Sequence, residues 1–239
     1  MNKNEVLKKI LQAIITPSKW GKLSKHIGTL FNNIVRYRSF SLNPNTKHYW
    51  NSRLSKIEDF WRDENYFHIL DLFPQNGVFS LLDIGCAIGD GCEMLQKKFP
   101  KASITGVDIS EVGIEKAKQK TRTVKYLVLD ILKDELPEQY DYITIIETLE
   151  HFDNPFFVID KCLNYVKEAI IISTPYSRQT FSTAKMDSSE HRYFFNEDTF
   201  SNYNCRVIKI TDFVKVTKSR CIVYEIRPSQ KSLEVNGRH

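Results

Sequence analysis

The chain has 239 residues, enough for one α/β domain with a sizeable core and an N-terminal extension. Its composition, 41% hydrophobic and 26% charged, is typical of a globular protein. The five cysteines are scattered and form no C-x-x-C pair, which argues against a disulfide framework and against a zinc site, so we expect a reducing, cytoplasmic location.

The net charge of +5 is concentrated at the start of the chain. Residues 1–40 hold eight Lys or Arg and one acid, so they carry +7 and the remainder carries −2 (5 − 7). Apolar residues between Leu7 and Ile15 fall on one helical face, and Lys8 and Lys9 make this stretch too polar for a secretory signal. Such a helix packs on its own domain or a partner, or lies on an anionic membrane surface. Nucleic-acid binding is a third use, which a basic patch alone does not establish.

Residues 48–72 are rich in aromatic side chains and predict a helical stretch before a turn at residues 74–77. No apolar run in the sequence is long enough to span a bilayer, so we expect a soluble protein.

The stretch from Ser80 to Gly91 predicts a buried parallel strand followed by a glycine-rich turn, and residues 92–99 then predict a helix. A strand, a turn and a helix in this order open many nucleotide-binding α/β units, because glycine lets the backbone turn sharply and lets a ligand approach it closely. Two further predicted strands, residues 103–108 and 124–129, each end at a carboxylate, Asp108 and Asp130.

The rest of the chain continues the α/β pattern. Residues 140–146 predict a fourth strand, and a helix follows from about Pro155, with Asn154 or Asp153 as its N-cap. Residues 169–173 predict a fifth strand, and residues 206–211 and 221–226 a closing pair. Residues 177–190 have no periodicity and predict a long loop of the kind that often covers a site, followed by a short helix that ends near Tyr203.

The run Asp83-x-Gly85-x-Ala87-x-Gly89, with the acids that follow it, resembles the first motif of the class I S-adenosylmethionine-dependent methyltransferases. The resemblance extends from about Phe79 to the C-terminus. It departs at Ala87, where that family usually has glycine. It implies a Rossmann-like, seven-stranded, mostly parallel sheet at residues 77–227, after an N-terminal helical extension at 1–76 and before a flexible tail at 228–239. The implied cofactor is S-adenosylmethionine.

The resemblance also implies how that cofactor is held. The backbone from Gly85 to Gly89 faces the methionine moiety, Asp108 binds the ribose, Asp130 and Ile131 contact the adenine, and Ile109 packs against it. The predicted cofactor-binding set is Asp83, Gly85, Cys86, Ala87, Gly89, Asp108, Ile109, Asp130, Ile131 and Glu147. In related small-molecule enzymes a segment before the first strand folds over the ligand, a role open to Tyr49 and Trp50; the alternative is that both pack into the core.

A nicotinamide-dependent dehydrogenase is the competing class for a glycine-rich turn. It requires G-x-G-x-x-G, whose third glycine position is Asp90 here, and a second nucleotide-binding half, which the chain lacks. The sequence therefore excludes hydride transfer.

The fourth predicted strand leads into Glu147-x-x-Glu150-His151, and His191 follows later. His151 suits a general base, since an unperturbed imidazole titrates near neutral pH; alternatively it shapes the pocket wall. Glu147, Glu150, His151 and His191 together could hold a divalent metal ion. This set resembles the metal motif of small-RNA 3′-terminal 2′-O-methyltransferases, but Glu-x-x-Glu-His also resembles the ubiquinone-biosynthesis and sugar O-methyltransferases. The chain departs from the RNA enzymes at Pro175-Tyr176, where they have Pro-Asn, and at Phe194-Phe195, near which they have Trp, so RNA is the less favoured acceptor.

The predicted activity is methyl transfer to oxygen on a small molecule, glycan or lipid-linked intermediate, with Glu150, His151 and His191 as catalytic residues. The alternatives are a metal-dependent RNA 2′-O-methyltransferase and a non-catalytic S-adenosylmethionine-binding scaffold.

Overall fold

The computed structural model describes residues 44–58, 66–177, 190–211 and 220–229, all within one compact unit of the chain. The predictions for residues 1–40 and for most of the 177–190 loop lie outside the described residues. Within the described part, no helix combines the length and the hydropathy that a membrane crossing requires.

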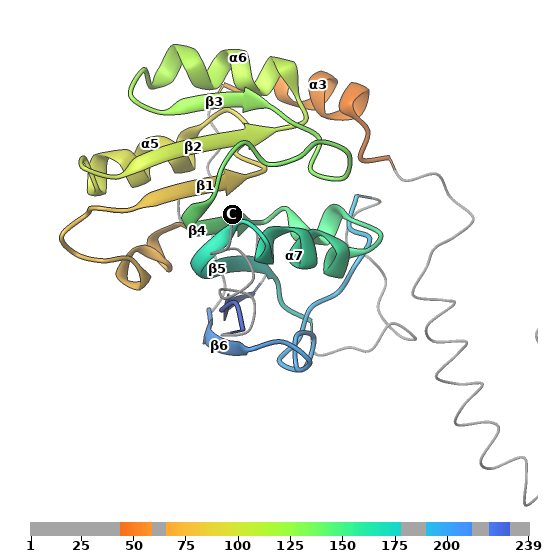
Figure 1. Ribbon diagram of the computed structural model, residues 1–239. Coiled ribbons are helices and arrows are strands. Elements are labelled where there is room, and N and C mark those ends of the chain that lie inside the picture. The colour runs from red at the N-terminus through yellow and green to blue at the C-terminus, as the bar shows by residue number, and fades with distance from the viewer. Residues whose placement is uncertain (1–43, 59–65, 178–189, 212–219, 230–239) are drawn as a thin grey trace, which may run out of the picture. The chain divides into compact units, whose positions relative to one another are not determined.

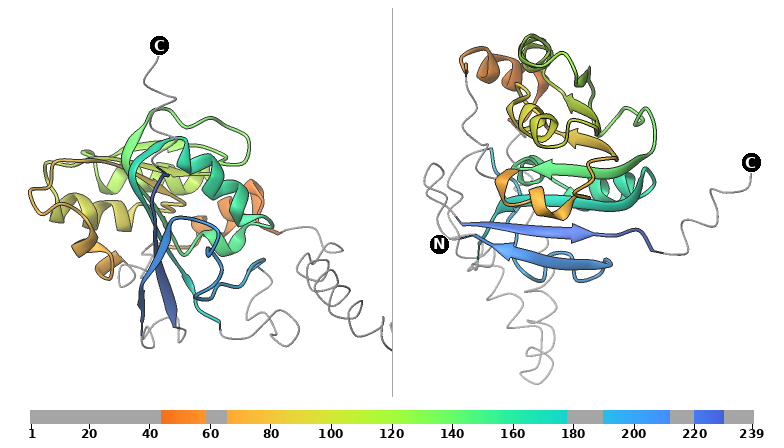
Figure 2. Two further views of the ribbon diagram at one scale, coloured as in Figure 1. Left: turned by 60° about the horizontal axis from the view of Figure 1, so that its bottom comes forward. Right: turned by 90° about the vertical axis from the view of Figure 1, so that its left-hand side faces the viewer.

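Seven strands form a single sheet in the order β3-β2-β1-β4-β5-β7-β6 (Figure 1). The first five strands are parallel, and β7 runs antiparallel to both β5 and β6. This architecture confirms the predicted Rossmann-like sheet and its antiparallel closing pair, which is seen edge-on in Figure 2. The strands are β1 (Ser80–Ile84), β2 (Ser103–Asp108), β3 (Lys125–Val128), β4 (Tyr140–Ile146), β5 (Val166–Pro175), β6 (Cys205–Ile210) and β7 (Cys221–Ile226).

Both faces of the sheet are covered because its central strands are apolar at consecutive positions. Leu81 and Leu82, neighbours in β1, belong to two separate core clusters on opposite faces. One cluster includes residues of α5 (Asp90–Lys98) and α6 (Glu111–Lys120), and the other includes residues of α7 (Pro155–Leu163). The order of the strands reverses between β1 and β4, which is where an open α/β sheet binds its ligand.

The helix starts follow local capping chemistry. Ser110 Oγ accepts a hydrogen bond from Gly113 N–H (3.0 Å) at the start of α6. Asn154, one of the two predicted caps, accepts from Phe157 N–H (3.3 Å) at the start of α7. Each cap contributes about 1 kcal/mol relative to alanine.

Described residues before β1 pack against the sheet and its helices. Helix α3 (Lys47–Ser55) lies beside α6 (Figure 1), and the 3-10 turn η1 (Leu70–Leu72) follows later. Tyr66, Ile69 and Phe73 are buried in the same cluster as α5. A Cβ at Gly91 would lie 2.1 Å from the Tyr66 ring, so this glycine lets the ring lie directly against α5.

The structure differs from the sequence prediction at residues 197–203, which form successive turns rather than a helix. The side chain of Asn196 accepts a hydrogen bond from Asp198 N–H (3.0 Å), and Thr199 Oγ1 accepts one from Asn196 N–H (2.9 Å). These side chains bond to nearby backbone and so compete with helical hydrogen bonds.

Candidate active site

A cavity of about 760 Å³ lies at the carboxyl ends of β1, β2, β3 and β4, at the reversal of strand order. Its walls come from α3, the turn after β1, the loops after β2 and β3, and the segment after β4. Of the predicted cofactor-binding residues, seven line it: Gly85, Ala87, Asp108, Ile109, Asp130, Ile131 and Glu147.

The turn after β1 is tight. Gly85 and Gly89 have φ values of 78° and 85°, in the left-handed region that glycine favours. A Cβ at Gly85 would lie 2.3 Å from Thr148 Oγ1, so the turn brings the backbone against the residue that follows β4. Ala87 has a φ of 50° despite its Cβ, so this departure from the family motif adopts the conformation that glycine would give, at a cost in strain.

Asp108 ends β2 and fixes the turn. Its Oδ2 accepts a hydrogen bond from Ala87 N–H (3.0 Å), and its Oδ1 accepts one from Ser110 N–H (2.8 Å). Burial nevertheless raises the pKa of Asp108 to about 6, because it disfavours the charged form more than these two bonds favour it. A carboxylate held there can accept both hydroxyls of a ribose.

The loop after β3 supplies an acidic and apolar wall. Asp130 Oδ1 accepts from Leu132 N–H (3.1 Å), and Asp130 Oδ2 pairs with Lys133 Nζ (2.7 Å). Ile131 is buried, and Ile109 faces the cavity from the end of β2. Two apolar side chains with a carboxylate suit a flat, polar-edged ring such as adenine.

Three predicted cofactor-binding residues, Asp83, Cys86 and Gly89, are not among those that line the cavity. Asp83 is fully buried; its oxygens accept hydrogen bonds from the Thr144 hydroxyl (2.7 Å) and the Tyr66 hydroxyl (2.9 Å). Cys92 Sγ adds a third contact at 3.2 Å. Asp83 therefore ties β1 to β4 and to the segment before β1, and a direct contact with a cofactor stays a prediction.

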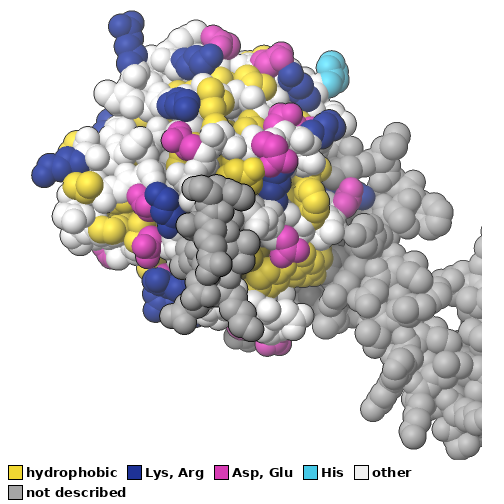
Figure 3. All heavy atoms as spheres, viewed as in Figure 1, with side chains coloured by type: hydrophobic (Ala, Val, Ile, Leu, Met, Phe, Trp, Pro, Cys, Tyr) yellow, Lys and Arg dark blue, Asp and Glu magenta, His cyan; other side chains and the backbone are white. Residues whose placement is uncertain are grey.

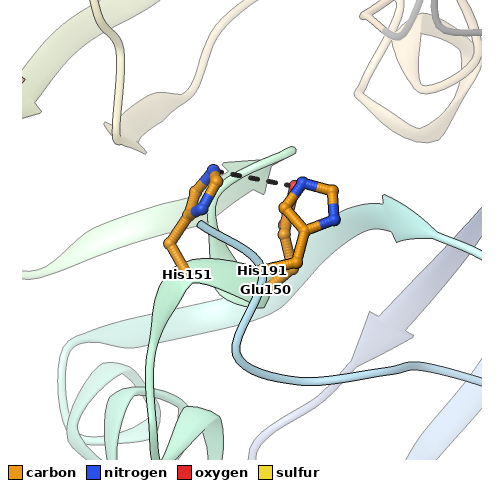
Figure 4. A group of neighbouring side chains, drawn as sticks. All are labelled: Glu150, His151 and His191. Carbon is orange, nitrogen blue, oxygen red and sulfur yellow. Dashed lines mark ion pairs between the residues drawn. The ribbon is translucent and has the colours of Figure 1, made fainter. Parts of the chain in front are cut away.

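Glu150, His151 and His191 converge beside the cavity (Figure 4). One potential ligand atom from each lies within 4.8 Å of the others. His151 lines the cavity itself, in the 3-10 turn η2 (Leu149–His151) after β4. Glu150 Oε1 is 4.0 Å from His151 Nε2, and the two imidazole rings are 5.3 Å apart.

The protonation pattern of His151 follows from its surroundings. Its Nδ1 lies 3.2 Å from the backbone carbonyl of Glu190. Since a carbonyl can only accept, this contact places the proton on Nδ1, and Nε2, which lies 4.0 Å from Glu150 Oε1, is then the ring nitrogen that carries a lone pair. The geometry thus suits either chemistry predicted for His151.

Glu147, the fourth predicted metal ligand, is not in this group. It lines the cavity, and its Oε1 accepts a hydrogen bond from Ser173 Oγ (3.0 Å) on β5. Its φ of 48° is unusual for a residue with a side chain, so the chain turns sharply as β4 ends.

Helix α3 forms one wall of the cavity through Trp50 and Leu54. The Trp50 ring meets His151 edge to face, with centroids 5.0 Å apart. Trp50 therefore lies in the cavity wall and not in the core, while its role over a bound ligand stays a prediction. Sequence reasoning missed Asn45, Thr148 and Glu190, because a single polar residue in a loop carries no periodicity.

Comparisons with known proteins agree with this geometry. Residues 82–169 match the family model described as a methyltransferase domain. A malonyl-[acyl-carrier protein] O-methyltransferase of Priestia megaterium is 38% identical over 96 residues, or 39% of this chain and 35% of that protein. A ubiquinone biosynthesis O-methyltransferase of Pseudomonas fluorescens is 33% identical over 93 residues, or 36% of this chain and 39% of that protein. The match thus spans less than half of either relative.

Solved structures share the fold. The magnesium protoporphyrin IX methyltransferase ChlM of Synechocystis PCC 6803 aligns with a TM-score of 0.55 at 16% identity, over 70% of this chain and 82% of that one. The [4+2]-cyclase SpnF aligns with a TM-score of 0.58 at 13% identity, over 70% of this chain and 80% of that one. Since a cyclase shares it, the fold alone does not fix the reaction. Residues 82–169 are therefore similar to a methyltransferase domain, and the chain has the seven-stranded α/β fold of the solved methyltransferase with which it aligns.

Proposed function

We propose that this protein transfers a methyl group from S-adenosylmethionine to an oxygen atom of a small molecule, a glycan or a lipid-linked intermediate. The observation that carries the proposal is the placement of His151 on the wall of the cavity that Asp108 and the turn after β1 also line. The names of both curated relatives, which describe O-methyltransferases, support oxygen as the acceptor atom.

Different residues of the cavity would contact different parts of S-adenosylmethionine. The carboxylate of Asp108 would hold the ribose hydroxyls, while Ile109 and Ile131 would hold the adenine between apolar surfaces. The Gly85 to Ala87 backbone would lie along the methionine moiety. S-adenosylmethionine, when bound, supplies an electrophilic methyl group, and the protein must align the acceptor oxygen with it.

His151 would act as the general base. Its Nε2 takes the proton of the acceptor hydroxyl as the oxygen–methyl bond forms and the carbon–sulfur bond breaks. Glu150, with an oxygen 4.0 Å from that nitrogen, favours the resulting imidazolium, and the hydrogen bond to Glu190 keeps Nδ1 protonated throughout.

A divalent metal ion is a second candidate for the same corner, favoured by the convergence of Glu150, His151 and His191. Two imidazoles and one carboxylate are a donor set that first-row divalent ions accept. Such an ion would acidify a bound hydroxyl. Glu147 lies outside this three-residue set, so the ion would be held by Glu150, His151 and His191.

Removal of metal ions distinguishes metal-assisted methyl transfer from methyl transfer with His151 as the general base alone. If an ion is used, excess chelator and His191→Ala should each lower methyl transfer at least tenfold, and Mn²⁺ or Zn²⁺ should restore activity to the chelated protein. If His151 acts as the base alone, activity in excess chelator stays within about twofold of the untreated enzyme.

Methyl transfer can be tested with methyl-labelled S-adenosylmethionine and a cell extract as the source of acceptors. The proposal predicts label in small-molecule, glycan or lipid-extractable material, and none with His151→Ala. Label that only ribonuclease releases would contradict the proposal and support an RNA 2′-O-methyltransferase instead. On the face drawn in Figure 3, basic and acidic side chains are interspersed among the described residues, which fits a small acceptor better than a polyphosphate chain.

The location is proposed to be cytoplasmic. The basic segment at residues 1–40 either packs against protein or lies on an anionic membrane. Flotation with vesicles of phosphatidylglycerol decides between the two: the membrane alternative fails if a protein without residues 1–40 floats as well as the full chain.

A further inference from the structure

Glu190 lies between helix α3 and the histidines His151 and His191, and only 9% of its surface is exposed. Its carboxylate accepts hydrogen bonds from the Tyr49 hydroxyl and from Arg53 Nη1 (2.7 Å), both on α3. Its backbone carbonyl faces the other way: it lies 3.2 Å from His151 Nδ1 and accepts from Asn45 Nδ2 at 2.7 Å. One residue thus contacts α3 with its side chain and the proposed base with its main chain.

We infer that Glu190 is a positioning residue, whose carboxylate anchors the main chain at residue 190 so that its carbonyl fixes the tautomer of His151. The inference rests on the proposed methyl transfer only for its catalytic consequence. Imidazole exchanges its proton readily between two nitrogens, and a fixed acceptor at Nδ1 selects the form in which Nε2 can take a proton.

Helix α3 is held in place by contacts with α6 that do not involve Glu190. Helix α3 is fixed to α6, because Lys116 Nζ donates to the carbonyls of Leu54 (2.9 Å), Ser55 (3.0 Å) and Ile57 (2.7 Å). Asn51 Oδ1 also accepts from Ser110 Oγ (2.7 Å). Loss of the Glu190 carboxylate should therefore loosen residue 190, whose carbonyl then keeps only its contacts with Asn45 and His151 among the described residues, and should leave α3, with its part of the cavity wall, in place.

Loss of the Glu190 carboxylate should lower kcat and leave cofactor binding almost unchanged. A His151 in the other tautomer presents an N–H to the acceptor hydroxyl and cannot remove its proton. Glu190→Ala should therefore lower kcat by about 10-fold to 100-fold, the usual effect of removing a residue that orients a functional imidazole. The affinity for S-adenosylhomocysteine should change by less than about threefold, since the cofactor walls do not depend on Glu190.

Two variants complete the catalytic series. Glu190→Gln keeps one acceptor oxygen for Tyr49 and Arg53, so kcat should stay within about fivefold of the wild type. Glu111→Gln is the matched control, since it breaks an exposed ion pair between α6 and Lys47 of α3 but leaves residue 190 untouched; its kcat should be unchanged.

The direct test is ¹⁵N NMR of the histidine side chains at pH 8.5 on the full chain, with the His151 signals identified by their loss in His151→Gln. We expect a single Nδ1–H tautomer in the wild type and in Glu111→Gln, and a mixture in Glu190→Ala. A pure Nδ1–H tautomer in Glu190→Ala, or a kcat equal to the wild type, would overturn the inference. This NMR readout needs no turnover, so an inactive wild-type protein would count against the proposed function while the tautomer still decides the role of Glu190.

Discussion

At the scale of single residues, the site depends on groups held in unfavourable states. Asp108 is a carboxylate whose pKa burial raises from an ordinary 3.8 to about 6. Its charged form therefore destabilises the ligand-free protein once the pH rises above about 4, by about 3 kcal/mol when ionisation is complete above pH 6. Such a group is retained more readily for a ligand than for stability.

The first prediction concerns this carboxylate. Affinity for S-adenosylhomocysteine should be constant between pH 7 and 8 and fall below about pH 6, by up to tenfold per pH unit, because the ligand must compete with a proton on Asp108. Titration calorimetry at four pH values measures this. In Asp108→Asn the profile should be flat; a decline that persists in this variant would assign the pH dependence to another group.

The second prediction concerns the turn after β1. Ala87→Gly removes a Cβ from a left-handed residue and should raise the free energy of unfolding by about 0.5–1 kcal/mol, the strain of that conformation less the added entropy of the unfolded chain. Gly85→Ala places a Cβ 2.3 Å from Thr148 Oγ1 and should lower it by at least about 2 kcal/mol. Urea unfolding of both variants provides the comparison. Equal stabilities would show that the two turn residues are not constrained as described.

At the scale of elements, α3 is a short helix that contributes to the site only because α6 holds it. Its own sequence gives little amphipathic pattern, and one residue, Leu54, is buried. Lys116 on α6 provides hydrogen-bond donors to the carbonyls at and just beyond the C-terminal end of α3, where the helix leaves acceptors unsatisfied.

The third prediction follows from this arrangement. Lys116→Met should destabilise the docking of α3 by about 1–2 kcal/mol and speed amide hydrogen exchange in residues 47–55 about tenfold. The matched control is Lys118→Met, two residues along the same helix, because among the described residues Lys118 pairs with Glu115 of α6 itself. If amide hydrogen exchange in α3 is equally fast in both variants, Lys116 does not anchor this helix.

The sequence predicts helices and strands better than it predicts the contacts between residues far apart in the chain. The strands and the acids at their ends were readable because buried parallel strands are apolar runs, and because such strands end at one edge of the sheet. Asp83 shows the limit: its place in a motif predicts a cofactor contact, which stays a prediction, but the motif gives no sign of its hydrogen bonds with Tyr66 and Thr144, which lie 17 and 61 positions away. The role of Glu190 depends on contacts with residues more than 130 positions away and has no local pattern.

At the scale of the whole molecule, the sheet order brings the ends of β1, β2, β3 and β4 to one cavity, and the segment before β1 covers part of it. The division at residue 76 between an extension and a catalytic domain stays a prediction, although five residues before it already line the cavity: Asn45, Thr46, Lys47, Trp50 and Leu54. The acceptor is set by the surfaces around this cavity, which the sequence motifs do not encode.

The central claim, that this cavity binds S-adenosylmethionine through Asp108, is tested most directly by titrating S-adenosylhomocysteine into the wild type and Asp108→Ala at pH 7.5. We predict one site per chain in the wild type and an affinity at least about 30-fold weaker in Asp108→Ala, the loss of two hydrogen bonds to a charged acceptor. The melting temperature of the ligand-free variant should stay close to that of the wild type, because removal of the buried charge offsets the loss of the hydrogen bonds from Ala87 N–H and Ser110 N–H. Unchanged affinity in Asp108→Ala, or no binding by the wild type, would contradict the account.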